Sequence, residues 1–173
     1  MHSFMLLRRG VVVAEGYWDP YGASDTHMLF SLSKSFTSTA VGMLVAEGKL
    51  TVEDAVLGFF PDERPADPSA QLRVMRVKHL LTMTTGHHVD PSAVVRQGGP
   101  NWRRAFLAQP VEHEPGTHFV YNSVATYMLS AIVQRLTGQP VVDFLGRACS
   151  RRSASAPPSG RHRQRASVRV AGG

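Results

Sequence analysis

The chain has 173 residues, of which 43% are hydrophobic and 18% charged, a composition that is typical of one globular domain and excludes a disordered or fibrous protein. Its formal charge of +6 is distributed unevenly. Residues 1–146 contain 12 Lys and Arg against 13 Asp and Glu, whereas residues 147–173 contain seven Arg and no acidic residue. The sequence pI near 10.1 therefore reflects the C-terminal tail and does not indicate a nucleic-acid or membrane partner for the rest of the chain.

The single cysteine, Cys149, cannot form an internal disulfide and excludes a metal site built from several cysteines. Arg8 and Arg9 interrupt the apolar start of the chain, so no signal peptide is expected and the cytoplasm is the default location. No apolar run approaches the roughly 20 residues of a transmembrane helix. We therefore expect no membrane span.

Two β-strands are predicted at the start of the chain. Residues 4–7 and 11–18 contain β-branched and aromatic side chains on either side of Gly10, which predicts a hairpin with a tight turn. From Ser31 the apolar residues recur at spacings of three and four, which predicts a helix that ends at Gly48. Ser31 is thus expected at the N-terminus of a helix.

Short helices and loops are expected in the rest of the body. Thr51 offers a hydroxyl cap for a short helix that Pro61 closes, while proline and glycine mark the loops. The last helix is expected to be the longest, because its apolar residues share one face. Helices are predicted over residues 51–60, 77–83, 101–108 and 122–136, and loops over residues 64–71 and 87–100.

The composition changes abruptly after Gly146. Arg, Ser, Ala, Pro and Gly dominate residues 147–173, in which Val168 and Val170 are the branched aliphatic residues. Such a segment buries too little apolar surface to offset the entropy of ordering it, so we expect no structure there. We divide the chain into a body, residues 1–146, and a disordered tail, residues 147–173. Our hypothesis for the tail is an out-of-frame end, which sequencing of the coding DNA would test.

The segment Ser31-Leu32-Ser33-Lys34 has the spacing of an activated serine nucleophile. A serine hydroxyl needs a neighbouring base, and a lysine three positions later on a helix lies on the same face, one turn away. The helix N-terminus also favours negative charge on the serine oxygen or on a bound oxyanion. The alternative is a helix-capping serine beside a solvated lysine. The chain uses 16 Arg against three Lys, which favours a specific use for lysine at position 34.

Four stretches, in this order, are similar to class C β-lactamase-like serine hydrolases, a family that includes penicillin-binding proteins, esterases and D-aminopeptidases. The resemblance covers roughly residues 2–146. It implies an α+β fold with helices packed on an antiparallel sheet, of which this chain is expected to hold a truncated version, an N-terminal β-hairpin followed by a mostly helical region. The four stretches are residues 2–10, residues 28–42, residues 79–86 (HLLTMTTG), and Pro115-Gly116-Thr117 leading into Tyr121-Asn122-Ser123.

The resemblance also implies roles for individual residues. Ser31 would form the acyl-enzyme, Lys34 would shuttle its proton, and Tyr121 would be the second member of the acid–base pair; the alternative for Tyr121 is a packing aromatic. The family commonly has Tyr-x-Asn at this motif, whereas here Asn122 and Ser123 follow Tyr121. We predict Asn122 and Ser123 as substrate contacts, with capping of the long helix as the alternative.

Other candidate sites are less specific. His87, His88 and Asp90 suggest a metal site, but no fourth ligand follows at a recognisable spacing, so we expect loop or surface residues and no metal or other cofactor. His113 and His118, on either side of a Pro-Gly turn, receive the same interpretation. No phosphate loop or dinucleotide fingerprint is present.

The sequence therefore predicts a serine hydrolase that acts on an ester, amide or β-lactam in a small-molecule or peptide-like acyl substrate, through a Ser31 acyl-enzyme. The family's third motif, Lys-Thr-Gly or His-x-Gly, does not occur in the sequence, so slow or absent turnover and low stability are expected. The alternative is a catalytically inactive fragment whose basic tail binds anionic polymers. Because the tail lacks interleaved aromatic residues, nucleic acid is not the expected partner. Neither the substrate nor the oligomeric state follows from the sequence.

Overall fold

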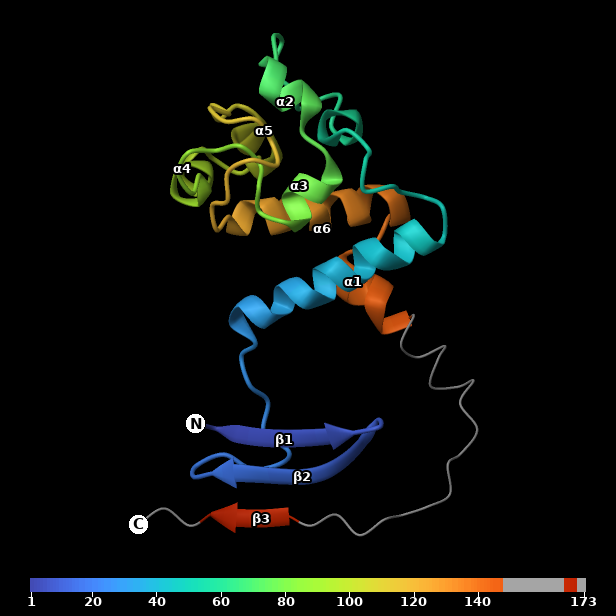
Figure 1. Ribbon diagram of the computed structural model, residues 1–173, viewed down its shortest axis with the longest axis vertical. Coiled ribbons are helices and arrows are strands. Elements are labelled where there is room, and N and C mark those ends of the chain that lie inside the picture. The colour runs from blue at the N-terminus through green and yellow to red at the C-terminus, as the bar shows by residue number, and fades with distance from the viewer. Residues whose placement is uncertain (148–166, 171–173) are drawn as a thin grey trace. The chain divides into compact units, whose positions relative to one another are not determined.

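The computed structural model describes residues 1–147 and the strand at residues 167–170. The chain forms two compact units, one that begins with Met1–Phe30 and includes the C-terminal strand, and one that begins at Ser31. The first unit is a small sheet and the second is helical (Figure 1). The predicted order, a β-hairpin followed by a mostly helical region, is confirmed.

The hairpin consists of β1 (Ser3–Arg8) and β2 (Val11–Trp18), paired antiparallel from Ser3 opposite Tyr17 to Arg8 opposite Val11. Arg9 and Gly10 both have positive φ, +51° and +76°, as the two-residue turn of a twisted hairpin requires. A register shift interrupts the ladder between Leu6 and Leu7. The sequence prediction of a tight turn at Gly10 is confirmed.

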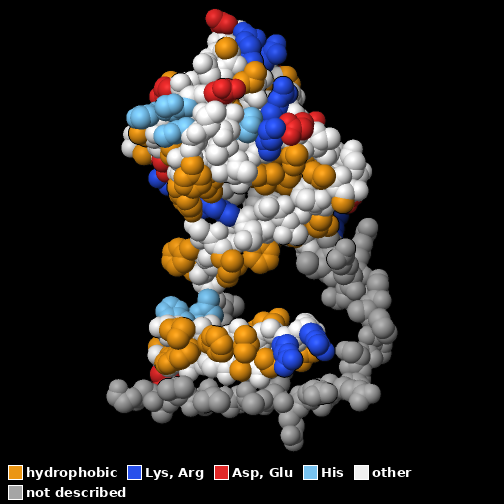
Figure 2. All heavy atoms as spheres, in the orientation of Figure 1, with side chains coloured by type: hydrophobic (Ala, Val, Ile, Leu, Met, Phe, Trp, Pro, Cys, Tyr) orange, Lys and Arg blue, Asp and Glu red, His pale blue; other side chains and the backbone are white. Residues whose placement is uncertain are grey.

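The hairpin buries little of its apolar surface within its own unit. All six residues of β1 are exposed, and apolar side chains line the strand pair (Figure 2). Leu7, for example, is 57% exposed. Because burial of apolar area is the main favourable term in folding, this hairpin gains little stability from its own contacts.

The strand β3 (Ser167–Val170) pairs parallel with β2, from Glu15 opposite Ser167 to Trp18 opposite Val170. The expectation of no structure in the tail is wrong for these four residues, and the sheet is mixed rather than purely antiparallel. The physical reason is that β2 offers an open edge of backbone donors and acceptors, while valines alternate in the tail segment. The rest of the predicted tail, Cys149 included, lies outside the described residues.

The helix α1 (Ser33–Ala46) follows a single 3-10 turn, η1 (Phe30–Leu32), so Ser31 lies just before the first α-helical turn. The chain leaves the helix at Gly48, whose φ of +69° is the left-handed conformation that glycine adopts without strain. Ala40, Val41 and Leu44 are the buried residues of α1. The predicted helix and its glycine end are confirmed.

Three segments differ from the predictions. In place of a helix over residues 51–60, the Asp54 carboxylate accepts hydrogen bonds from the backbone N–H and hydroxyl of Thr51 and closes a turn before the 3-10 helix η2 (Val56–Phe59). Two short helices were not predicted: α2 (Ala70–Val74) begins at the end of the loop expected over residues 64–71, and α4 (Ser92–Gln97) lies inside the loop expected over residues 87–100. Each contributes a buried apolar residue, Leu72 and Val95 respectively, so packing stabilises helices that local propensity does not specify.

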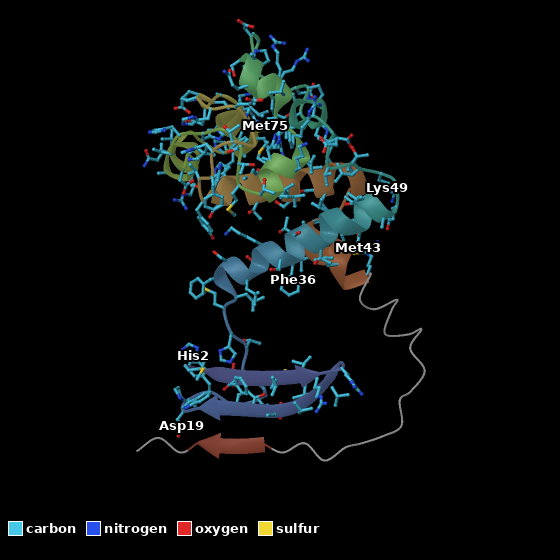
Figure 3. All side chains as sticks on the ribbon, in the orientation of Figure 1. His2, Asp19, Phe36, Met43, Lys49 and Met75 are labelled. Atoms are coloured by element: carbon cyan, nitrogen blue, oxygen red, sulfur yellow. The ribbon has the colours of Figure 1, made fainter. Side chains whose placement is uncertain are left out.

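The remaining predicted helices are confirmed as α3 (Val77–Leu81), α5 (Trp102–Leu107) and α6 (Ser123–Thr137). α6 is the longest, and it ends at Gly138 with φ +70°. It contacts α1, α3, α4 and α5 and is the central helix of the unit (Figure 1). The core around it includes Met75, labelled in Figure 3, and the largest fully buried side chains Phe60, Phe106, Leu44, Leu80, Met128 and Ile132. Across the described residues, the helices lack the length and apolar character that crossing a membrane requires.

The buried His79 caps α3. Its Nδ1 accepts a hydrogen bond of 3.0 Å from the backbone N–H of Arg76, which is the reciprocal half of a capping box. Burial, assisted by the neighbouring Lys78 charge, lowers the pKa of His79. The folded protein therefore favours the neutral imidazole, the form that can accept this hydrogen bond.

We expect this cap to make stability depend on pH. A histidine whose pKa is lowered on folding contributes its full stabilisation above the unfolded value near 6.5 and loses it as the pH falls below that value. His79→Gln keeps a side-chain acceptor at this helix position but does not titrate. Between pH 7.5 and pH 5, the thermal midpoint of the wild type should fall by at least about 2 °C more than that of the variant. Equal decreases in the two proteins would contradict the role assigned to His79.

Candidate active site

Ser31 and Lys34 lie on the same face at the start of α1. The Lys34 Nζ donates a hydrogen bond of 3.2 Å to the Ser31 Oγ. Phe30, the residue before Ser31, has φ +46°, an uncommon backbone conformation for a bulky side chain, and it directs the chain into η1. The side chain of Ser31 is exposed and that of Lys34 is half-buried. The pair predicted from the three-residue spacing is thus formed in the structure.

Tyr121 joins this pair from a distant part of the chain. Its phenol oxygen lies 2.6 Å from the Ser31 Oγ, although 90 positions separate the two residues. The Lys34 ammonium also lies 5.1 Å from the centre of the Tyr121 ring. The Ser31 oxygen therefore has two neighbours capable of exchanging a proton with it.

The hydrogen bonds of this group shift the pKa of Tyr121 toward the phenolate form. Hydrogen bonds from Lys34 and, to a smaller extent, from Ser31 lower the pKa of Tyr121 below its ordinary value of 10.0. Ser123 makes a further, smaller contribution in the same direction. A phenol with a lowered pKa is a better general base near neutral pH than an ordinary tyrosine.

Backbone hydrogen bonds hold the segment that carries Tyr121. The N–H of Val120 donates to the carbonyl of Met83, and the N–H of Gly116 donates to the carbonyl of Thr84, at 3.1 and 2.8 Å. The N–H of His113 donates to the carbonyl of Gly86 at 2.9 Å. Residues 113–120 are thereby tied along residues 83–86 before the chain enters α6.

Gly86 permits this close approach. Its φ is +89°, and a Cβ at this position would lie 2.4 Å from the carbonyl oxygen of His113 and 2.8 Å from a methyl group of Val111. Both values are far below van der Waals contact, and one of the atoms belongs to the backbone. Only glycine fits here without displacing the segment that leads to Tyr121.

Asn122 and Ser123 were predicted to contact substrate, and the structure separates them. Asn122 is fully buried: its Oδ1 accepts from the backbone N–H of Ala125 as the cap of α6, and its Nδ2 donates to the hydroxyl of Thr85. Both polar atoms of the Asn122 amide therefore bond groups inside the protein and do not face a substrate. The alternative prediction, that Asn122 caps the long helix, describes its position in the structure. Ser123 is exposed next to Tyr121 and remains a candidate contact.

A buried polar network behind Tyr121 was missed by sequence reasoning. His87, expected as a loop or surface residue, lies in a loop but is 2% exposed, and its Nδ1 lies 2.8 Å from the hydroxyl of Thr85. Burial lowers the pKa of His87 to about 4. Because the Asn122 amide donates to the Thr85 oxygen, the Thr85 hydroxyl is left to donate to His87. A neutral His87 and Thr85 thus support the cap that follows Tyr121.

The other candidate ligands from the sequence have different surroundings. Asp90 is exposed and accepts from the backbone N–H of Ser92 at the start of α4, which is a structural role. His88, exposed as predicted, lies close to His113 and His118, and the ligand nitrogens of these three all lie within 4.8 Å of one another. His88 and His113 are 25 positions apart in the sequence, a spacing that gives no signal for grouping the three histidines.

Comparison with known proteins identifies the family and the fold. The family model described as beta-lactamase matches residues 2–167, which is most of the chain and extends past residue 146, where the sequence resemblance was placed. The chain therefore belongs to the beta-lactamase family. Its relatives are hydrolases of this family, and the fold is that of β-lactamases and penicillin-binding proteins.

Individual relatives include the 6-aminohexanoate-dimer hydrolase of Paenarthrobacter ureafaciens, which is 30% identical over 158 residues, 83% of this chain and 40% of the relative. A solved beta-lactamase/D-alanine carboxypeptidase from Yersinia pestis superimposes with a TM-score of 0.56 at 21% identity, over 72% of this chain and 37% of the other. A D-stereospecific amidohydrolase from Streptomyces sp. has the same TM-score at 22% identity, over 73% and 42%. The chain thus spans less than half the length of these relatives.

Replacing Gly86 by alanine should destabilise the helical unit by more than about 2 kcal/mol, because the new methyl group meets the His113 carbonyl and the backbone conformation is strained. Gly48→Ala is the matched control, since Gly48 also has positive φ but nothing lies within 4 Å of an added Cβ. The control should cost about 1 kcal/mol. Denaturant unfolding of both variants measures the difference, and equal losses would show that the close approach at Gly86 does not matter.

Proposed function

We propose that this chain carries the acyl-transfer machinery of a serine hydrolase, with Ser31 as nucleophile and Lys34 and Tyr121 as its acid–base pair. The single observation that carries the proposal is the Ser31 oxygen, which lies within hydrogen-bonding distance of both the Lys34 nitrogen and the Tyr121 oxygen. A nucleophile and a base in contact, with a third group that orients the base, is the recurrent arrangement of covalent catalysis.

The proposed reaction begins with attack of the Ser31 oxygen on the carbonyl carbon of an ester, amide or β-lactam. The serine proton passes to the Lys34–Tyr121 pair as the new C–O bond forms. The same pair then returns the proton to the leaving oxygen or nitrogen as the scissile bond breaks, which leaves an acyl-enzyme on Ser31. Water attacks the acyl-enzyme with help from the same pair, which releases the acid and restores the serine.

Lys34 acts in this scheme through both its charge and its proton. As an ammonium it favours the Tyr121 phenolate, which then accepts the serine proton. It also donates to the Ser31 oxygen, which stabilises the negative charge that develops there. The start of α1 adds to this effect, because its N-cap Leu32 provides no side-chain cap and the positive end of the helix dipole lies beside Ser31.

The proposed substrate is a small-molecule or peptide-like acyl compound. Support comes from the 6-aminohexanoate-dimer hydrolase, whose name describes hydrolysis of a small aminohexanoate dimer. Ser123, exposed beside Tyr121, is the proposed polar contact for that substrate.

Covalent labelling tests the nucleophile. Incubation with a fluorophosphonate or an acylating β-lactam should add one adduct to the wild type and to Ser38→Ala, a control that removes an exposed hydroxyl elsewhere on α1. Ser31→Ala should acquire none. Intact-protein mass spectrometry provides the measurement. Labelling of Ser31→Ala, or of none of the three proteins, would reject Ser31 as the nucleophile.

The pH dependence of acylation tests the acid–base pair. The lowered pKa of Tyr121 predicts that the labelling rate of the wild type rises with pH over a range below 10. The labelling rate of Tyr121→Phe should not show this rise and should be lower than that of the wild type by a factor of at least about 10².

The pH dependence also tests Lys34. Lys34→Met should move the rise in labelling rate to higher pH, whereas Lys34→Arg, which keeps the positive charge, should move it less. Lys49→Met, which replaces the lysine labelled at the far end of α1 in Figure 3, is the control and should match the wild type. Identical profiles for wild type and Lys34→Met would contradict the electrostatic role of Lys34.

The alternative function, a catalytically inactive fragment whose tail binds anionic polymers, rests on the seven arginines of residues 147–173. It predicts DNA binding that weakens steeply with salt and disappears when residues 147–173 are deleted. Absence of covalent labelling together with such binding would replace the proposed function by this alternative.

A further inference from the structure

Three imidazoles gather on the surface of the helical unit, outside the Ser31 group. Figure 2 shows histidine side chains collected on one flank of this unit. The Nδ1 of His88 lies 3.0 Å from the Nε2 of His113, and the His113 and His118 rings are stacked with their centres 4.2 Å apart. One ligand nitrogen from each residue can be chosen so that all lie within 4.8 Å of one another.

The backbone that carries these histidines is held by the contacts that position Tyr121. The hydrogen bond from the His113 N–H to the Gly86 carbonyl joins the segment of His88 to that of His113. The Thr117 N–H and hydroxyl both donate to the carbonyl of Glu114, which fixes the turn between His113 and His118. The three imidazoles therefore come together on an ordered scaffold rather than at the tip of a free loop.

The donor set matches what a borderline transition-metal ion takes. Zn²⁺ binds imidazole nitrogen at about 2.0–2.1 Å, which places neighbouring ligand nitrogens about 3.4 Å apart in a tetrahedral site. The His88–His113 nitrogen separation of 3.0 Å is close to that value, and one nitrogen from each of the three residues lies within 4.8 Å of the others, so ring rotations can bring the three nitrogens around one ion. The Glu112 carboxylate accepts a hydrogen bond of 3.0 Å from the backbone N–H of His88. It thereby holds the backbone of His88 in place and puts a negative charge near the three imidazoles.

We propose that His88, His113 and His118 form a three-histidine site for a divalent transition-metal ion of the zinc type. His88 is exposed and the other two are half-buried, which leaves the fourth coordination position open to water or an exogenous ligand. The ion replaces the proton shared between His88 and His113 and joins residues 86–88 to residues 113–118. Because Tyr121 follows His118 by three residues, metal binding stabilises the segment that leads to the proposed active site. The proposal does not depend on catalysis by Ser31.

Direct metal binding by the full-length chain tests the site. Equilibrium dialysis against Zn²⁺ should give one bound ion per chain, and Co²⁺ should give the visible absorption of a tetrahedral nitrogen site. The His88→Gln, His118→Gln double variant should lose at least tenfold in affinity and lose the Co²⁺ spectrum. His2→Gln, His27→Gln is the matched control, since it removes two histidines of the other unit, and it should bind as the wild type does.

The thermal midpoint provides a second measurement that does not depend on activity. Added Zn²⁺ should raise the midpoint of the wild type and of the control, and EDTA should reverse the increase, because an ion that binds the folded chain stabilises it. The single variant His88→Gln, which changes an exposed side chain, should show a reduced increase. Absence of stoichiometric zinc binding by the wild type, or equal binding by the double variant, would overturn the proposal.

Discussion

The packing of α1 against α6 is the interaction on which the proposed active site depends. α1 carries Ser31 and Lys34 at its start, and Tyr121 stands directly before the residue that caps α6. The contact between the helices buries Ala40, Val41 and Leu44 in the core that surrounds α6. Because helices are stiff, apolar packing along their length fixes where the polar groups at their ends meet. The 2.6 Å contact between Ser31 and Tyr121 is therefore a consequence of core packing.

A second constraint comes from residues 83–87, which lie along residues 113–122. The two segments are held together by backbone hydrogen bonds, and Gly86 permits their close approach. Next to them lies the buried network of Asn122, Thr85 and His87. Within this network the Nδ1 of His87 and the amide of Asn122 both bond the Thr85 hydroxyl, while the His87 Nε2 is buried with no hydrogen-bond partner among the described residues. The three-histidine site proposed here is on the outer side of the same arrangement, so the two proposals share a scaffold although their chemistry differs.

The sheet and the helical unit differ in how much of their apolar side-chain surface is buried. The helical unit has a cluster of fully buried side chains, whereas the hairpin leaves apolar residues such as Leu7 more than half exposed. The chain spans 40% of the 6-aminohexanoate-dimer hydrolase. The groups proposed for acylation all lie in the well-packed unit. The proposed acylation chemistry therefore depends on the packing of the helical unit.

The sequence by itself determined the features that depend on neighbours along the chain. Arg9 and Gly10 specify a hairpin turn, a spacing of three on a helix places Lys34 beside Ser31, and Gly48 and Gly138 end their helices, because local backbone geometry decides each of these. Tyr121 was found through family resemblance, since its distance from Ser31 along the chain carries no local signal. Only the tertiary structure decided the burial of His87, the inward use of Asn122, the pairing of β3 with β2, and the meeting of His88, His113 and His118. Each of these results from packing between segments far apart in sequence, a relation that periodicity and spacing do not encode.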